Sequence, residues 1–231
     1  MPATKRKPLV AVLDWKPAPA SNSGVDLEAK VLGQGVRTKY YLIDTEADFT
    51  PEILGADALI VWQNTLITER TLDRLKRCRA LIRNGVGFDS VDIAAAAARE
   101  IPVCNVPDYG TEEVADHAIA LTLALTRQLF PLNAEAKRPG WKLVAKNKLR
   151  RTSTLTFGVI GLGRIGTAAA LRAKALGFRV MFYDPHLPNG VHKAVGIERM
   201  DSLAKLLKPV SYTHLRAHET SLQLVCRLLL E

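Results

Sequence analysis

Short apolar runs alternate with helical patterns along the first part of the chain. Runs of about four to eight apolar residues between turn residues are typical of buried strands. Such runs predict strands at residues 9–13, 39–43, 58–62, 80–83 and 101–106. Helical patterns occupy residues 25–32, 51–54, 68–77 and 91–99. Strands that alternate with helices predict a parallel sheet covered on both faces, and hence an α/β fold.

A long apolar segment and a second strand–helix–strand pattern follow. Residues 114–129 are apolar nearly all round, which predicts a buried or interface helix. Residues 157–160 and 180–183 have the composition of buried strands, and the helical segment between them ends at Gly177. Residues 201–207 predict a further short helix.

A glycine pattern between those two strands is the most informative motif. Gly161, Gly163 and Gly166 fit G-x-G-x-x-G directly after a strand and at the start of a helix. Gly161 permits the tight turn, Gly163 lets backbone approach a pyrophosphate, and Gly166 lets the helix pack close to the sheet. The helix begins around Arg164 and Ile165, so its N–H groups face bound phosphates, and Arg164 adds a cation.

An acidic residue completes the pattern. Asp184 follows the second strand at the spacing that a dinucleotide-binding unit requires. Its carboxylate would accept a hydrogen bond from a ribose 2′-OH and repel a 2′-phosphate, which favours NAD over NADP. The order strand, glycines, helix, strand and acid therefore predicts a dinucleotide site, and an ordinary glycine-rich turn is the alternative.

Composition and charge narrow the possible partners. The chain has 231 residues, 48% of them hydrophobic, and a net charge of +9. That length fits one large domain or two small ones, and the charge suits an anionic cofactor and a carboxylate substrate. Nucleic acid is the weaker interpretation, because the basic residues are dispersed and lack interleaved aromatics. Residues 137–151 carry seven basic residues and no acid, which favours a solvated connection over an anion-steering segment.

Cysteine and histidine positions suggest no metal site. Cys78, Cys104 and Cys226 show neither a disulfide framework nor metal-ligand spacing, which favours a reducing compartment. His186 and His192 are interpreted as loop residues. No segment approaches the ~20 apolar residues of a membrane span, so we expect a cytoplasmic protein.

One histidine lies inside the long apolar helix. His117 is compatible with a ligand or catalytic role, although a hydrogen-bonded buried histidine is the interpretation that we favour.

Five spaced motifs occur in a fixed order. They are residues 84–92 (NGVGFDSVD), 105–107 (NVP), 112–118 (EEVADHA), 161–166 (GLGRIG) and 183–185 (YDP). Together they resemble the D-isomer-specific 2-hydroxyacid dehydrogenases over about residues 8–208. Within that superfamily the chain looks most similar to the C-terminal-binding-protein branch, and phosphoglycerate dehydrogenase is a more distant look-alike.

The resemblance implies two domains with doubly wound parallel sheets. A flavodoxin-like substrate domain would occupy residues 1–104. Residues 105–208 would form the first half of a Rossmann NAD-binding domain, which is therefore incomplete. Residues 209–231 are a tail that resembles no part of the family. The family is commonly dimeric, with residues 112–127 at or near the subunit contact.

The resemblance also implies a substrate loop at residues 83–87. Arg83 and the backbone N–H groups of Val86 and Gly87 would bind a substrate carboxylate, and Val86 would also lie near the nicotinamide. The alternative is that Gly85 and Gly87 serve only a tight turn. The implied reaction is hydride transfer between nicotinamide C4 and C2 of a small 2-hydroxy or 2-oxo acid.

The end of the chain departs from the family. The family's catalytic arginine, glutamate and histidine lie downstream of the glycine loop, but the expected segment does not follow Lys208. Residues 210–220 instead resemble the translation of a common sequencing-library adapter, so we expect an assembly artefact there. His214 and His218 are four apart without an evident third ligand, and no catalytic role is assigned to the tail.

Four consequences are expected from that departure. The chain as given should have an uncovered sheet edge, marginal stability, weak NAD affinity and no dehydrogenase activity. The competing hypothesis is an NAD-responsive dimeric corepressor or scaffold, as the resemblance to the C-terminal-binding-protein branch allows.

Overall fold

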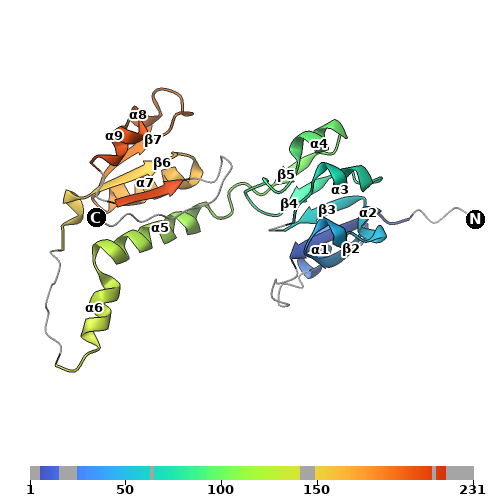
Figure 1. The fold of residues 1–231 in the computed structure, drawn as a ribbon, viewed down its shortest axis with the longest axis horizontal. Helices are drawn as coiled ribbons and strands as arrows, with labels where there is room; N and C mark the ends of the chain where they lie inside the picture. Colours follow the sequence, from blue (N-terminus) through green and yellow to red (C-terminus); the bar gives the residue numbers. More distant parts are fainter. Residues whose placement is uncertain (1–5, 16–24, 63–64, 141–148, 210–211, 217–231) are drawn as a thin grey trace, which may run out of the picture. The chain divides into compact units, whose positions relative to one another are not determined.

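The chain divides into two compact units. The computed structural model describes residues 6–15, 25–62, 65–140, 149–209 and 212–216. The units are Met1–Tyr109 and Gly110–Glu231 (Figure 1). The division falls after Tyr109 rather than after residue 104, because strand β5 (Val103–Asn105) hydrogen-bonds within the sheet of the first unit. Cys226, His218 and residues 141–148 of the basic segment lie outside the described residues.

The first unit is built on a five-stranded sheet with the order β2-β1-β3-β4-β5. Every neighbouring pair is parallel. The other four strands are β1 (Leu9–Trp15), β2 (Arg37–Ile43), β3 (Ala58–Val61) and β4 (Leu81–Arg83). This is the flavodoxin-like strand order, and it confirms the predicted parallel α/β architecture.

The helices of the first unit are α1 (Val25–Leu32), α2 (Pro51–Leu54), α3 (Glu69–Arg74) and α4 (Ile93–Ala98). Two of them, α2 and α4, begin at a residue whose side chain caps the helix. The hydroxyl of Thr50 accepts a hydrogen bond from the N–H of Ile53, and the carboxylate of Asp92 accepts one from the N–H of Ala95. Such caps satisfy backbone donors that the first helical turn leaves free.

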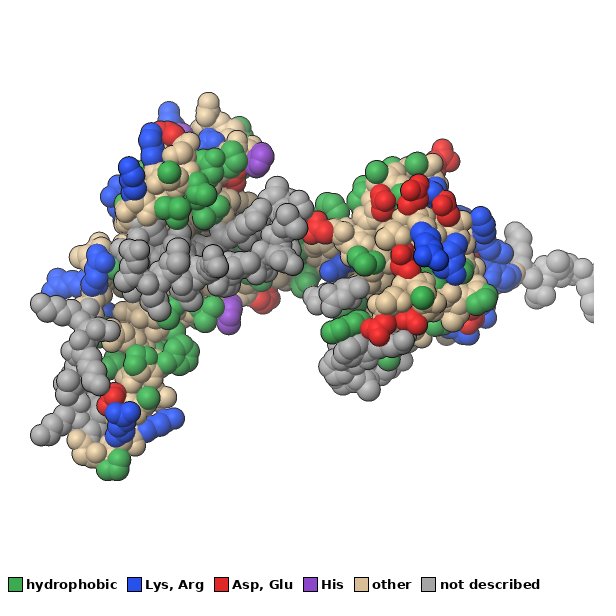
Figure 2. Space-filling view, viewed as in Figure 1, with side chains coloured by type: hydrophobic (Ala, Val, Ile, Leu, Met, Phe, Trp, Pro, Cys, Tyr) green, Lys and Arg blue, Asp and Glu red, His purple; other side chains and the backbone are tan. Residues whose placement is uncertain are grey.

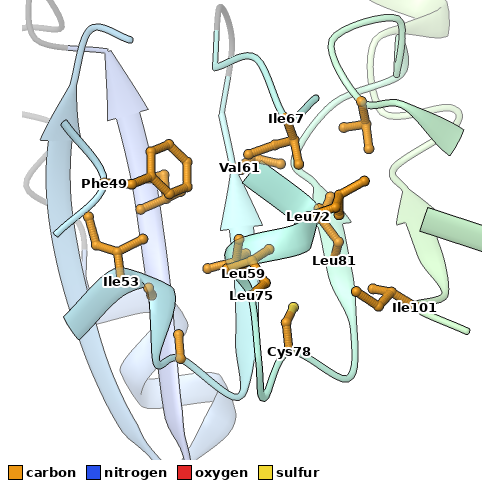
Figure 3. Packing of buried hydrophobic residues seen from close by; sticks show 14 of the residues in the cluster. Phe49, Ile53, Leu59, Val61, Ile67, Leu72, Leu75, Cys78, Leu81 and Ile101 are labelled. Carbon is orange, nitrogen blue, oxygen red and sulfur yellow. The ribbon is translucent and has the colours of Figure 1, made fainter. Parts of the chain in front are cut away.

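Aliphatic side chains from the central strands and α3 form the core of the first unit. Leu59 and Leu81 come from neighbouring strands, and Leu72 projects from α3 toward them (Figure 3). All three are almost wholly buried. Because this core contains only residues of the first unit, it can stabilise that unit without help from the second.

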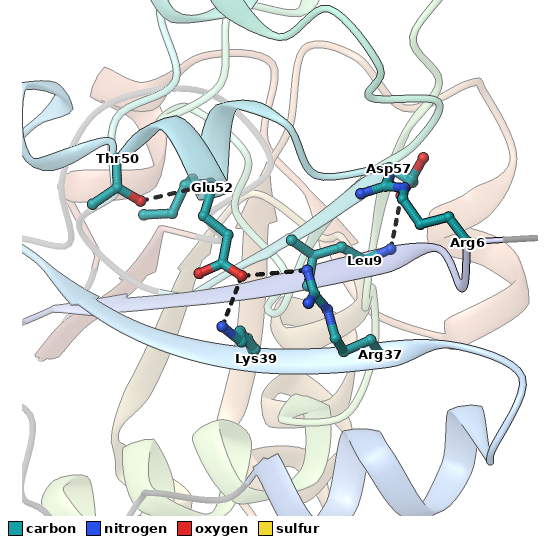
Figure 4. Close-up of polar contacts among 8 residues, drawn as sticks. Arg6, Leu9, Arg37, Lys39, Thr50, Glu52 and Asp57 are labelled. Carbon is teal, nitrogen blue, oxygen red and sulfur yellow. Dashed lines mark hydrogen bonds and ion pairs between the residues drawn. The ribbon is translucent and has the colours of Figure 1, made fainter.

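Charged groups fix the amino ends of the strands. Asp57, just before β3, accepts a hydrogen bond from the N–H of Leu9 at 2.7 Å and pairs with Arg6 (Figure 4). Glu52 pairs with Lys39 at 2.7 Å. The segment that the sequence predicted to bind substrate lies at the opposite edge, where the carboxyl ends of the strands are.

The second unit contains a four-stranded parallel sheet with the order β8-β7-β6-β9. Its strands are β6 (Thr156–Ile160), β7 (Arg179–Tyr183), β8 (Glu198–Arg199) and β9 (Tyr212–Arg216). The pair β6–β7 is the strand pair predicted on either side of the glycine helix, whereas β8 was not predicted.

Strand β6 is paired on both sides, so the edge expected directly beside β6 is filled, and β8 and β9 are the terminal strands of this sheet. Strand β9 belongs to the tail and pairs with β6 through Phe157↔Tyr212 and Gly158↔Thr213. The register then shifts between Gly158 and Ile160. Strand pairing uses backbone groups, so an extended segment can cover an edge without family-specific side chains. The adapter origin of the tail stays a prediction.

Helices cover the sheet of the second unit. They are α5 (Thr111–Thr126), α6 (Leu129–Ala136), α7 (Arg164–Ala175), α8 (Val191–Val195) and α9 (Leu203–Leu207). Helix α7 packs against β6, β7 and α5, and α5 also contacts β9 and contributes Ile119 to the core of the sheet. Ala115 and Ala118 of α5 pack with Ala169 of α7, and these small side chains allow the two helices to approach closely.

The long apolar segment, predicted to be a buried or interface helix, is buried on one face of α5 only. It breaks at Gln128, whose φ of +54° separates α5 from α6. Helix α6 contains no buried residue, and Leu129 and Phe130 are exposed on it. His117 is also exposed, so the expectation of a buried histidine was wrong. Only one face of α5 is covered by α7, which hydrophobic patterning alone did not reveal.

Two features of the described residues concern possible partners: the charge on the surface and the length of the apolar helices. Acidic and basic side chains are interspersed on the face of the first unit that Figure 2 draws. Among the described residues, no helix is both long and apolar enough to span a bilayer.

Candidate functional site

The glycine loop joins β6 to α7 and has the backbone geometry that the motif predicted. Gly161 has a φ of +85°, a conformation that favours glycine, and its N–H donates to the carbonyl of Tyr183 at 2.9 Å. Gly163 is the N-cap of α7. A Cβ on Gly166 would meet the carbonyl oxygen of Gly161 and approach Val159 to 3.4 Å. The close packing predicted for Gly166 is therefore observed.

The first residues of α7 have different surroundings. Arg164 begins the helix and its side chain is exposed. The side chain of Ile165 packs against the alanine cluster shared by α5 and α7. A contact between Ile165 and a cofactor would therefore use its backbone N–H, which belongs to the first turn of the helix.

Asp184 is hydrogen-bonded into the loop that it was predicted to complete. One carboxylate oxygen accepts from the N–H of Leu162 at 2.9 Å, and the other accepts from the N–H of His186 at 2.9 Å. The carboxylate thus holds the glycine loop and the start of the following loop together. Each oxygen has a second lone pair, so it can also accept from a ligand hydroxyl.

A cavity of about 510 Å³ opens beside Asp184 at the carboxyl ends of β7 and β8. Its lining residues come from those ends, the following loop and α8: Tyr183, Asp184, Pro185, Asn189, His192, Arg199, Met200 and Asp201. His192 therefore lies in a helix and beside a cavity, so its interpretation as a loop residue was wrong.

Arg199 shapes one wall of this cavity. Its guanidinium donates to the backbone carbonyls of Asp184 and Leu187, each at 2.9 Å, and to that of Pro188 at 3.3 Å. These bonds fix the loop after β7. The sequence analysis missed Arg199, since its role depends on a short strand that had no clear pattern.

The predicted substrate loop lies at the carboxyl end of β4. The Nε and Nη1 atoms of Arg83 are buried and have no hydrogen-bond partner in the described part of the chain. Burial lowers the pKa of this guanidinium, and the charge of Tyr109 opposes that effect. A Cβ on Gly85 would collide with Nη1 of Arg83. Gly85 thus makes room for the guanidinium, beyond any role in the turn.

Asn105 positions the rest of this loop. Its side-chain Nδ2 donates to the carbonyl of Val86 at 2.8 Å, and the N–H of Val106 donates to the carbonyl of Gly85 at 3.1 Å. Among the described residues, no hydrogen bond from the N–H of Val86 or Gly87 is found. Asn105 was noted only as part of a motif, because the sequence did not indicate which group it contacts.

The described residues show no cluster suited to a metal. No group of three or more His, Cys, Asp or Glu side chains in those ranges is arranged to hold an ion. Cys78 is buried, Cys104 is exposed, and both are free thiols.

The groups around the glycine loop fit the pyrophosphate and adenosine parts of NAD. The N-terminal turn of α7, which Gly163 begins, and the cavity beside Asp184 lie in the same unit. A cavity of this size is within the usual range for small-molecule sites.

The chain matches known proteins over most of its length. A family model described as "D-isomer specific 2-hydroxyacid dehydrogenase, catalytic domain" matches residues 13–224. D-3-phosphoglycerate dehydrogenase of Methanocaldococcus jannaschii is 33% identical over 168 residues, which are 73% of this chain and 32% of that protein. C-terminal-binding protein 1 of Caenorhabditis elegans is 28% identical over 209 residues, or 87% of this chain and 28% of that protein.

Solved structures show the same fold. The D-lactate dehydrogenase of Aquifex aeolicus, crystallised with NAD and lactic acid, has a TM-score of 0.76 and 26% identity. The match covers 88% of this chain and 59% of that one. The TT0316 protein of Thermus thermophilus has a TM-score of 0.71 and 29% identity, covering 90% and 64%. The chain thus spans about a third of the curated relatives' length.

Proposed function

Because the chain belongs to the family of D-isomer-specific 2-hydroxyacid dehydrogenases, we propose that it derives from an NAD-dependent oxidoreductase. The substrate would be a small 2-hydroxy acid or the corresponding 2-oxo acid. When bound, NAD supplies the hydride acceptor, and the protein positions the two reactants. The single observation that carries the proposal is the glycine loop closed by the carboxylate of Asp184.

The cofactor contacts would come from the glycine loop and the acid after β7. The N–H groups at the start of α7 would bind the pyrophosphate, through the loop glycines and Arg164 and Ile165. Asp184 would accept hydrogen bonds from the adenosine ribose. Arg199 donates to three carbonyls, so this cation is already engaged on the cavity wall. That arrangement supports NAD rather than NADP.

The substrate carboxylate would bind at the loop after β4. The Arg83 guanidinium and the N–H groups of Val86 and Gly87 supply donors, and Val86 would also contact the nicotinamide. Two buried guanidinium nitrogens of Arg83 have no partner among the described residues, and burying such groups is costly unless an anion completes them. This cost supports binding of a carboxylate over the alternative of a purely structural turn.

Cofactor binding can be tested on the 231-residue chain by calorimetric titration with NADH and NADPH. We expect NADH to bind and NADPH to bind at least tenfold more weakly, because the charge of Asp184 repels a 2′-phosphate. Asp184→Asn keeps an oxygen for the Leu162 N–H but removes the charge. It should therefore reduce the difference between the affinities for NADH and NADPH. Asp201→Asn, an exposed carboxylate on the same cavity, is the matched control. Equal affinity of the unchanged chain for both cofactors, or for neither, would contradict the proposal.

Catalysis by this chain is not expected. The arginine, glutamate and histidine that the resemblance places downstream have no counterpart in family context here. We therefore propose weak NADH binding without reduction of glyoxylate or pyruvate. Measurable NADH-dependent turnover by the purified 231 residues would contradict this part of the proposal.

The likeness to C-terminal-binding protein 1 supports an alternative. The natural protein would then be an NAD-responsive dimeric corepressor or scaffold. One property distinguishes this alternative from a dehydrogenase: the natural full-length protein would fail to reduce 2-oxo acids. Under either proposal we expect a cytoplasmic homodimer, and the exposed apolar residues Leu129 and Phe130 of α6 are consistent with a subunit contact.

A further inference from the structure

A basic patch lies at the amino ends of the strands of the first unit. It consists of two segments, residues 6–7 and 74–79. The first segment precedes β1, and the second runs from the last residue of α3 toward β4, so the parallel sheet brings both to the same edge. Together they contain six basic residues and no acid, and all six side chains are exposed: Arg6, Lys7, Arg74, Lys76, Arg77 and Arg79.

One carboxylate holds the two segments together. Asp57 accepts from Arg6 at 2.5 Å on one oxygen (Figure 4) and from Arg77 at 3.2 Å on the other. Its backbone carbonyl accepts from the N–H of Arg79 at 2.9 Å. Burial raises the pKa of Asp57, but the Leu9 N–H and the charges of Arg6 and Arg77 hold it below its usual value. A guanidinium has five N–H donors, so both arginines keep donors for an external anion.

The other cations of the basic patch are not neutralised by their neighbours. No ion pair or side-chain hydrogen bond of Lys7, Arg74 or Arg79 is found in the part of the chain that the structure describes. Lys76 donates to a backbone carbonyl, that of Asp73, at 2.9 Å and so keeps its full charge. The carboxylate of Asp73 pairs with Arg99 instead. The basic patch therefore carries an excess of positive charge over the acids that its side chains contact.

The lack of apolar groups narrows the kind of polyanion that would fit. Leu75 and Cys78 are the apolar residues of the second segment, and both are buried. Single-stranded nucleic acid is usually bound with aromatic stacking, and stable attachment to a bilayer usually adds inserted apolar groups to charge. A duplex presents regularly spaced phosphates and can be bound through its backbone alone.

We propose that the basic patch binds the phosphate backbone of double-stranded nucleic acid without sequence preference. The basic residues look dispersed along the sequence, but the fold gathers these six at one edge. This inference is independent of the proposed function, because the predicted substrate loop follows β4 at the opposite edge of the same sheet.

The test measures binding of a short fluorescent DNA duplex to the full 231-residue chain by anisotropy over a range of salt concentrations. The triple variant Lys7→Gln, Arg74→Gln and Arg79→Gln removes three cations without an internal partner, so the fold should be retained. We expect affinity to fall about tenfold or more, equally for duplexes of different sequence. The slope of log K against log salt should fall by about three, or about one for each phosphate contact.

A control variant separates the basic patch from the net charge of the chain. Lys137→Gln, Lys193→Gln and Lys208→Gln remove the same charge from exposed positions of the second unit and should leave affinity and salt slope unchanged. Equal loss in both triple variants would assign binding to net charge and overturn the inference. Absence of duplex binding by the unchanged chain at low salt would also overturn it, and so would patch-dependent binding only to vesicles of phosphatidylserine and phosphatidylcholine. None of these outcomes affects the proposed function, which the NADH titration tests.

Discussion

At the scale of single residues, Gly166 gives the sharpest prediction. Alanine there places a Cβ against the carbonyl oxygen of Gly161, which is backbone and cannot move without distorting the loop. Alanine gains up to ~1 kcal/mol in helix propensity, whereas overpacking costs roughly 1–3 kcal/mol, so we expect a net loss. Gly166→Ala should lower the free energy of unfolding in urea and abolish NADH binding.

The control for that substitution is another glycine-to-alanine change. A Cβ on Gly35 would meet no heavy atom within 4 Å, and its φ is not in the left-handed region. Gly35→Ala should therefore leave stability within about 0.5 kcal/mol and NADH binding unchanged. If Gly166→Ala behaved like Gly35→Ala, close packing at the glycine loop would be important neither for stability nor for NADH binding.

Residue roles could be predicted where a local backbone requirement dictates the amino acid. Gly161 and Gly166 were identified because a tight turn and a close helix contact exclude other residues. The contacts of Asn105 and the environments of His117 and His192 were not predicted. The contact of Asn105 with Val86 depends on a loop 19 positions away, and the environment of His192 depends on the short elements α8 and β8.

At the scale of elements, Glu46 caps a helix that has no side-chain cap of its own. Its carboxylate accepts from the N–H of Thr68 at 2.9 Å, from the Thr68 hydroxyl at 2.7 Å and from the hydroxyl of buried Thr71. Burial raises the pKa of Glu46, but the hydrogen bonds from Thr71 and Thr68 and the charge of Arg70 hold it below its usual value.

This depressed pKa gives a prediction with a definite sign. The stability that ionised Glu46 contributes is present above its unfolded-state pKa of about 4.3 and is lost as the pH falls through the folded-state value. Glu46→Gln should therefore cost roughly 1–3 kcal/mol at pH 7 and progressively less below about pH 4 in urea unfolding. Glu69→Gln, an exposed change on α3, should show little effect at either pH. If Glu46→Gln lowered the free energy of unfolding equally at all pH values, the charge of the Glu46 carboxylate would be excluded as the cause.

Element prediction succeeded where periodicity and caps agreed. Helix α7 begins at Arg164 and ends before Gly177, as the sequence indicated. The short elements α8 and β8 were missed, because two to five residues are too few for a period to appear. The break at Gln128 was missed for a different reason. The left-handed position is occupied by glutamine rather than by the glycine that usually marks a helix end.

At the scale of the whole molecule, the parallel α/β architecture followed from the alternation of strands and helices. The pairing of β9 with β6 did not follow from it, because the tail was assigned to no domain on the basis of its amino-acid sequence. Pairing requires only an extended backbone beside an open strand, and Tyr212 and Thr213 are residue types that favour strands. Resemblance to a family and capacity to complete a sheet are therefore separate properties of a segment.

That separation makes the contribution of β9 measurable. A chain ending at Pro209 lacks the partner of β6 and exposes the backbone groups of that strand. Because β6 also carries the glycine loop, we expect faster amide hydrogen exchange in Thr156–Ile160 and a lower unfolding temperature of the second unit. Amides of β1 should be unaffected, since the first unit has its own core. Unchanged protection of β6 would mean that the tail adds nothing to the sheet. Loss of protection would show that β9 stabilises the strand that carries the glycine loop.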